Sequence, residues 1–230
     1  MSLSESPLSF ELLKERQRNL RDSLPEFLDL RLHRALSWLQ RAELCEDDDG
    51  AFIFLWIALN AAYANDTHSE PEPEENTFHF FIKRIVQLDR DRQISDLLWD
   101  TWQKAIKHLL DNQYVYQRYW DFQNQKAGIE EWQISFNRAR DHSKSALANQ
   151  QTDVVLNIVM DRLYTLRNQL VHGGATCGGS VNRSQVMDGR QILASLVPLV
   201  IAIMLDNADE HWGEPYYPVR KREASESHGS

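Results

Sequence analysis

One stretch of the sequence, Ala51 to Asn65, is apolar around its whole circumference when it is wound as a helix. Such a helix is stable in water only when other elements cover most of its sides, so the stretch predicts a helix buried on most sides. Asn60 is its single polar interruption, and a buried amide needs hydrogen-bond partners. Two roles fit Asn60: a hydrogen bond to a neighbouring backbone group, or support for Arg167 or His172.

The rest of the chain repeats helical spacing. Apolar side chains recur three or four positions apart in the stretches 27–39, 78–110 and 156–170. Few segments alternate with a period of two, and none is bounded as a β-hairpin would be. We therefore expect an all-α fold, a helical bundle with additional helices and no significant sheet.

The composition suits one core. The 230 residues are 42% hydrophobic and include seven tryptophans, which is enough material for one sizeable core. We expect a single helical domain over residues 1–212 and a disordered tail over residues 213–230. The formal net charge of -9 argues against a general nucleic-acid coat and against a membrane-surface protein, since both carry a basic excess.

Cysteine usage and hydropathy bear on localisation. The two cysteines, Cys45 and Cys177, cannot build a disulfide framework, and the sequence does not open with a signal peptide. These features predict a cytoplasmic protein. The apolar run Ile192 to Leu205 is the one candidate for a membrane-spanning segment. Its 14 residues contain Pro198 and fall short of the roughly 20 residues that span a bilayer. We expect a buried or interface helix there, and no membrane partner.

No stretch carries the pattern of a metal or phosphate site. The acidic turn Glu46 to Gly50 lacks the spacing of a calcium loop, and the histidines lack the His-Glu-x-x-His spacing of a zinc site. The glycine-rich stretch Gly173 to Gly179 has no lysine after it and no strand before it, so it does not match a phosphate-binding P-loop. We interpret it as a helix cap and connector. We predict no metal and no cofactor.

The stretch Leu163 to Gly174 is the most informative about chemistry. It sets an arginine and a histidine near the end of an otherwise apolar helix. On a helical wheel, Arg167 falls inside the apolar sector. The polar stripe on the other side contains Asp161, Thr165, Asn168 and His172. An arginine that faces a core is costly unless its charge is paired or its stem reaches water.

These side chains suit phosphate chemistry. Histidine exchanges protons near neutral pH, and Asn168, one turn earlier, can hold the ring of His172. Arg167 supplies a permanent forked charge for a phosphate. Together they offer a base for the 2′-OH of RNA, an acid for the leaving oxygen and a cation for the charge that develops on phosphorus. One histidine cannot easily serve both ends of this displacement, whereas two copies facing each other across a twofold axis can.

The same residues could instead have a purely structural role. Arg167 then pairs with an acid such as Asp161, or with one from another helix, and His172 only ends the helix. The spacing of Arg167 and His172 by itself does not decide between a catalytic role and a structural role.

The run Leu-Arg-Asn-Gln-Leu-Val-His-Gly-Gly, from Leu166 to Gly174, closely resembles the signature of HEPN domains, especially the Apea-like group. The segment Trp56 to Tyr63 resembles the apolar helix that precedes it in that group. The resemblance implies a helical bundle, a homodimer with the motif at its interface and, often, metal-independent endoribonuclease activity in toxin, antiviral or RNA-processing settings. It makes Arg167 and His172 the catalytic pair and Asn168 a supporting residue.

The sequence also departs from part of that family. Toxins paired with a nucleotidyltransferase antitoxin carry a tyrosine two residues after the histidine, where this chain has Gly174, so the protein partner stays open. Our leading hypothesis is a homodimeric HEPN ribonuclease acting in defence or stress response, with Asn60 and Asp161 as further supporting residues. The alternative is a non-catalytic HEPN-like module that binds RNA or protein, and a third is a helical domain that binds a small molecule or nucleotide.

An acidic protein must hold RNA locally. We expect three arginines to do so: Arg162, Arg167 and Arg183.

Overall fold

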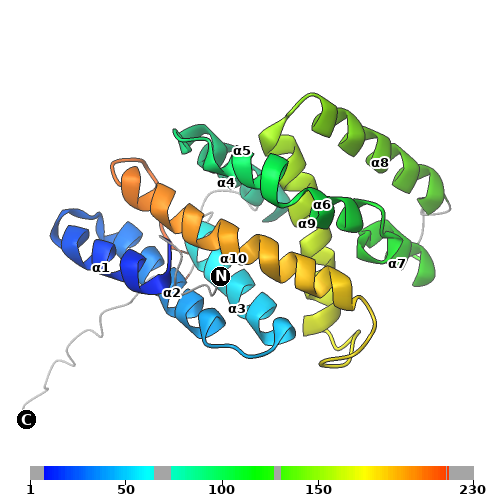
Figure 1. The fold of residues 1–230 in the computed structure, drawn as a ribbon, viewed down its shortest axis with the longest axis horizontal. Coiled ribbons are helices and arrows are strands. Elements are labelled where there is room, and N and C mark those ends of the chain that lie inside the picture. Colours follow the sequence, from blue (N-terminus) through cyan, green and yellow to red (C-terminus); the bar gives the residue numbers. More distant parts are fainter. Residues whose placement is uncertain (1–7, 65–73, 127–130, 216, 218–230) are drawn as a thin grey trace, which may run out of the picture.

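The structure is a computed structural model that describes residues 8–64, 74–126, 131–215 and 217 (Figure 1). This part of the chain is helical and contains no β-strand, which confirms the predicted all-α fold. Its α-helices are α1 (Phe10–Leu20), α2 (Glu26–Glu43), α3 (Asp48–Tyr63), α4 (Glu74–Leu88), α5 (Gln93–Asp96), α6 (Gln103–Leu110), α7 (Gln117–Gln123), α8 (Trp132–Ala148), α9 (Thr152–Val171) and α10 (Arg183–Asp206). Three short turns complete the elements: 3₁₀ turns at Arg21–Ser23 and Gln113–Val115, and a π-helical turn at Leu97–Thr101.

Helix α10 runs across the middle of the molecule (Figure 1). It contacts α1, α2 and α3 on one side and also packs against α4, α5, α6 and α9. Every residue from Ile192 to Leu205 is buried except Ser195, which is half-buried and accepts a hydrogen bond of 3.1 Å from the indole of Trp102. The apolar run of the sequence therefore closes the core of a single copy.

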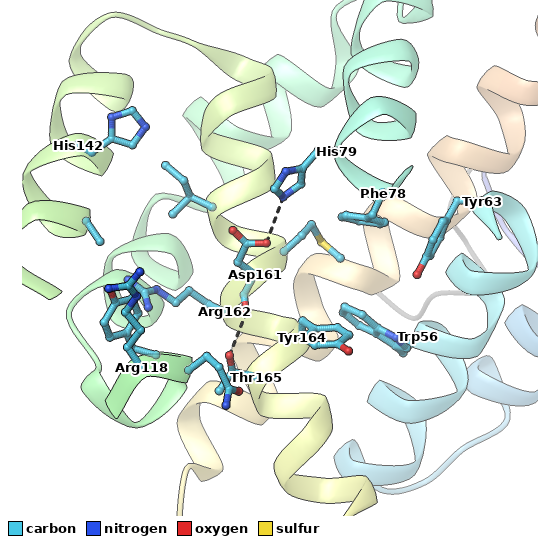
Figure 2. A pocket seen from close by; sticks show the side chains of 15 residues that line it. Trp56, Tyr63, Phe78, His79, Arg118, His142, Asp161, Arg162, Tyr164 and Thr165 are labelled. Carbon is cyan, nitrogen blue, oxygen red and sulfur yellow. Dashed lines mark hydrogen bonds and ion pairs between the residues drawn. The ribbon is translucent and has the colours of Figure 1, made fainter. Parts of the chain in front are cut away.

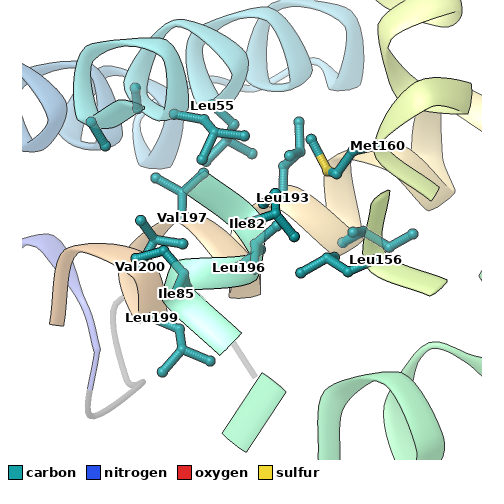
Figure 3. Packing of buried hydrophobic residues seen from close by; sticks show 14 of the residues in the cluster. Leu55, Ile82, Ile85, Leu156, Met160, Leu193, Leu196, Val197, Leu199 and Val200 are labelled. Atoms are coloured by element: carbon teal, nitrogen blue, oxygen red, sulfur yellow. The ribbon is translucent and has the colours of Figure 1, made fainter. Parts of the chain in front are cut away.

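The centre of this core joins four helices (Figure 3). Leucine and valine side chains of α10 pack with Leu55 of α3, with Ile82 and Ile85 of α4, and with Leu156 and Met160 of α9. Each fully buried aliphatic side chain contributes about 1.5–3 kcal/mol to stability. The position of α9 is set by this shared core.

By length and composition alone, α10 is the one helix in the described residues that could cross a membrane. Its apolar window is 72% buried inside the bundle. Packing within the chain therefore accounts for most of its apolar surface.

Helix α3 contains the stretch that is apolar all round. It begins at Asp48 because the carboxylate of Asp47 accepts a hydrogen bond of 2.7 Å from the backbone N–H of Gly50, which caps the first turn. The side chains of α3 are buried or half-buried from Ala51 to Tyr63, as predicted.

A fully buried arginine, Arg31 of α2, holds the segment that follows α10. Its guanidinium donates to the carbonyl oxygens of Ala64 (2.9 Å), Gly213 (3.3 Å) and Glu214 (2.7 Å). Burial lowers the pKa of Arg31 to about 10. The first residues of the predicted tail are thus fastened to α2 and α3, whereas its residues 218–230 lie outside the described part of the chain.

Gly189 lets α10 approach two other helices closely. A Cβ atom at this position would lie 2.8 Å from the ring of Phe52 in α3 and 2.9 Å from a methyl carbon of Leu163 in α9. Both distances are shorter than carbon atoms tolerate without movement of the neighbours. The absence of a side chain here is a packing requirement.

We expect Gly189→Ala to lower the free energy of unfolding by about 1–3 kcal/mol through overpacking. The intrinsic helix preference of alanine acts in the opposite direction by only about 1 kcal/mol. Urea unfolding measures the change, with Ser184→Ala on the exposed side of α10 as the control. A Gly189→Ala protein as stable as the wild type would show that the core yields at this contact.

Candidate functional site

The C-terminal end of α9 is a Schellman turn. The N–H of Gly173 donates to the carbonyl of Leu170 (3.2 Å), and the N–H of Gly174 donates to the carbonyl of Gln169 (2.7 Å). Gly173 has φ of 71°, the left-handed conformation that this turn requires after the C-cap residue His172. The helix stops where the glycine-rich stretch predicts, and the glycine after the histidine has a structural reason to be there.

The last turn of α9 is also tied to its neighbours. The amide of Asn182, just before α10, donates to the side-chain oxygen of Gln169 at 2.7 Å. The amide of Gln169 in turn donates to the carbonyl of Tyr114. These bonds hold the end of α9 in place.

Of the five predicted site residues, the structure joins Arg167 and Asn168 by a hydrogen bond. The guanidinium of Arg167 donates to the side-chain oxygen of Asn168 at 2.9 Å. His172 is exposed, and its ring makes no hydrogen bond or ion pair within the described residues. Asn168 therefore holds Arg167 and not the imidazole of His172.

The helical wheel placed Arg167 in the apolar sector, but the arginine of α9 that faces the core is Arg162. Arg162 is the buried arginine of α9, with 4% of its surface exposed, whereas Arg167 is half-buried and Val171 is 50% exposed. The guanidinium of Arg162 lies over two rings, 4.4 Å from the centroid of Tyr116 and 5.7 Å from that of Phe136. Residues of α8 and of the segment before α7 cover this flank of α9, so Arg162 is buried there and Arg167 is not.

Thr165 and Asp161 also depart from the predicted polar stripe. Thr165 is buried, and its hydroxyl donates to the backbone carbonyl of Asp161 at 3.2 Å. The exposed carboxylate of Asp161 lies 3.3 Å from the Nε2 atom of His79 in α4. Asp161 is therefore neither the ion-pair partner of Arg167 nor a support for it.

Asn60 follows neither of its two predicted roles. It is half-buried, and its side-chain oxygen is buried without a hydrogen-bond partner in the described residues. It makes no hydrogen bond to Arg167 or His172, so it supports neither residue by direct contact.

The outward face of α9 carries an exposed strip near this end. Tyr164 and Val171, seven residues apart, are 42% and 50% exposed. Arg167 and Asn168 lie between them at helical spacing, and His172 follows on the far edge. Apolar and cationic groups are thus presented together to whatever binds this face.

The connector after His172 is fastened to the start of α3. The carboxylate of Asp49 accepts hydrogen bonds from the backbone N–H of Gly178 (2.8 Å) and from both Nη atoms of Arg183 (2.8 and 2.9 Å). Because of the hydrogen bond from Arg183, the pKa of Asp49 is lowered from its ordinary value. Arg183, which we expected to hold RNA, is engaged within the chain.

One group of side chains has metal-ligand character. Atoms of Asp47, Asp49 and Cys177 lie within 4.8 Å of one another. Asp49 is already bound by Arg183 and the backbone, and Asp47 caps α3, so we assign no metal to this group.

Comparison of the chain with known proteins finds no matching family model, no similar curated protein and no similar solved structure.

The left-handed turn at Gly173 generates a stability prediction. We expect Gly173→Val to lower the free energy of unfolding by about 1–2 kcal/mol, since a side chain is disfavoured in this conformation. Gly173→Asn is the matched control, because asparagine tolerates the left-handed region. Thermal or urea unfolding distinguishes the two, and equal stability of both variants would contradict the role of the turn.

The Asp49 contacts generate a pH prediction. A carboxylate with a lowered pKa stabilises the fold above its unfolded pKa, near 3.8, and this contribution is lost as the pH falls through the folded pKa. We expect Asp49→Asn to reduce stability by on the order of 1 kcal/mol at neutral pH, and this difference to shrink below pH 3.8. Urea unfolding across this pH range measures it, with the exposed Asp141→Asn as the control. A difference that does not depend on pH would exclude the charge of Asp49 as its cause.

Proposed function

We propose that this protein is a metal-independent endoribonuclease whose active site is assembled from two copies of the C-terminal end of α9. The observation that carries the proposal is the placement of Arg167 and His172, which flank the exposed face of the last turns of α9. The resemblance of Leu166 to Gly174 to the HEPN signature supports the assignment. It also supports a role in defence or stress response, and the cysteine usage supports a cytoplasmic location.

The chemistry is in-line transesterification. The imidazole of one His172 takes the proton of a ribose 2′-OH while the 2′-oxygen forms a bond to phosphorus. The bond from phosphorus to the 5′-oxygen breaks, and the imidazolium of the second His172 protonates that oxygen. The guanidinium of Arg167 stabilises the added negative charge on the phosphoryl oxygens. The products are a 2′,3′-cyclic phosphate and a free 5′-hydroxyl.

Two copies are needed because one copy offers a single histidine for the two proton transfers. Within a single chain, Arg167 donates to Asn168, and the His172 ring is hydrogen-bonded to neither residue. A twofold contact through the same face would bring a second histidine and a second arginine to the seam. The exposed Val171 offers apolar surface that such a contact buries.

The charge distribution favours a substrate held by few phosphate contacts. Arg162 is buried and Arg183 is paired with Asp49, so of the three expected arginines Arg167 alone lies at the surface near His172. The protein carries a net charge of -9, which opposes general RNA binding.

A non-catalytic HEPN-like interaction module is the second candidate. The hydrogen bond between Arg167 and Asn168 favours it, because that bond occupies the cation that catalysis would use. Cleavage assays separate the two functions.

Purified wild-type protein in excess chelator is expected to cleave single-stranded RNA to products that end in 2′,3′-cyclic phosphate. His172→Ala and Arg167→Ala are each expected to reduce the rate at least about a hundredfold, the scale of a general acid or base and of an electrostatic stabiliser. His211→Ala, another exposed histidine, is the control purified in parallel. If all variants leave RNA intact or cleave it equally, the interaction module is the better assignment.

Mixing wild-type and His172→Ala chains tests the shared site. If each site uses both histidines, activity after exchange follows the square of the wild-type fraction. Activity that falls in direct proportion to that fraction would mean that each copy works alone. Sedimentation of the same mixtures reports whether dimers form.

A further inference from the structure

A cavity lies along α9, away from Arg167 and His172. It has a volume of about 420 Å³, within the range of about 300–1,000 Å³ that is usual for small-molecule sites. Its walls come from α3, α4, α8 and α9 and from the start of α7 (Figure 2). Neither Arg167 nor His172 lines it.

One side of the cavity is cationic. Arg162 reaches into this side from α9, and Figure 2 shows Arg118 and His142 on the same side of that helix. Arg118 and His142 are exposed, so their side chains are accessible to a ligand. Asp161 is the single carboxylate among the lining residues.

Arg162 is a buried charge that forms no ion pair with a carboxylate of the described residues, although the nearby charge of Asp161 raises its pKa against the larger effect of burial. It is 4% exposed, and its Nε atom has no hydrogen-bond partner within the described residues. Its guanidinium also makes no ion pair or hydrogen bond to any described residue, and lies over the ring of Tyr116 at 4.4 Å. Burial lowers the pKa of Arg162, yet an arginine remains charged. A desolvated charge costs stability unless an anion joins it, so this arginine points to an anionic ligand.

The other side of the cavity is aromatic. Trp56 and Tyr164 pack with ring centroids 6.0 Å apart and their planes tilted by 53°, and Tyr63 and Phe78 form an edge-on pair at 4.8 Å. Figure 2 shows these four rings together on the side of α9 away from Arg162. Tyr164 is 42% exposed, so its ring is open to a planar partner.

A polar pair separates the two sides. The Asp161 carboxylate and the His79 ring, 3.3 Å apart, lie between the aromatic rings and the arginines (Figure 2). A carboxylate here accepts hydrogen bonds from ligand N–H or O–H groups, which a ring with an amino group or a sugar provides.

We propose that this cavity binds a mononucleotide, with its phosphate toward Arg162 and Arg118 and its base against Trp56 and Tyr164. The forked guanidinium suits a phosphate, and the aromatic side chains suit the face of a base. Asp161 accepts a hydrogen bond from the base or the ribose. The site is separate from the end of α9, so it stands whether or not the protein cleaves RNA.

Titration calorimetry of the full chain tests the site with the four nucleoside monophosphates as probes. Inorganic phosphate and the unphosphorylated nucleosides are the comparison ligands. At least one nucleotide is expected to bind more tightly than both its nucleoside and phosphate. Arg118→Ala and Tyr164→Ala, both at exposed positions, are expected to weaken that nucleotide about tenfold or more, whereas Arg18→Ala on exposed α1 leaves it unchanged.

Arg162→Met separates binding from folding. Methionine keeps an apolar stem against Tyr116 and removes the buried charge, so the variant is expected to unfold at the same temperature as the wild type or a higher one. Its nucleotide affinity is expected to fall about ten- to a hundredfold. A purely structural role for Arg162 predicts the reverse, a less stable protein with unchanged affinity.

Four results would overturn the proposal. The first is that no nucleotide binds at millimolar concentration, and the second is that phosphate binds as tightly as the nucleotides. The third is that Arg118→Ala and Arg162→Met leave the nucleotide affinity unchanged. The fourth is that His172→Ala abolishes nucleotide binding. The last result would place the nucleotide at the end of α9. It leaves the ribonuclease proposal open, so the two proposals fail independently.

Discussion

The burial of α10 is the constraint on which the rest of the bundle depends. Its apolar run, Ile192 to Leu205, reaches α3, α4 and α9 at once, so the three helices share one core. Gly189 brings α10 within contact of α3 and α9 because it carries no side chain. Helix α8 and the segment before α7 cover another side of α9, so its exposed surface is concentrated in the strip from Tyr164 to His172.

The two arginines of α9 show how neighbours decide what a side chain does. Arg162 and Arg167 lie on one helix and carry the same charge. The rings of Tyr116 and Phe136 cover Arg162 and remove it from water, whereas Arg167 stays half-buried with Asn168 as its partner. The first therefore acquires an affinity for an anion inside a cavity, and the second remains available for one at the surface.

Helix α9 thus carries two candidate sites with different demands. The proposed site near His172 is exposed and made of few groups, which suits a site shared between two chains. The cavity beside Arg162 is enclosed by several helices and lined by aromatic rings, as expected of a small-molecule site. The Schellman turn at Gly173 explains part of the HEPN-like motif by backbone geometry alone. The assignment of chemistry then rests on Arg167 and His172.

The sequence by itself determined the all-α fold, the buried α3, the end of α9 at the glycine-rich stretch and the place of His172 on the polar side of α9. These depend on local periodicity and on glycine, which act within one helix or one turn. Only the tertiary structure decided that Arg162, and not Arg167, is buried, that Asp161 meets His79, and that a cavity exists. A helical wheel gives the angle of each side chain but not the neighbours that cover it. The rings over Arg162 belong to residues 116 and 136, and folding alone brings them to α9.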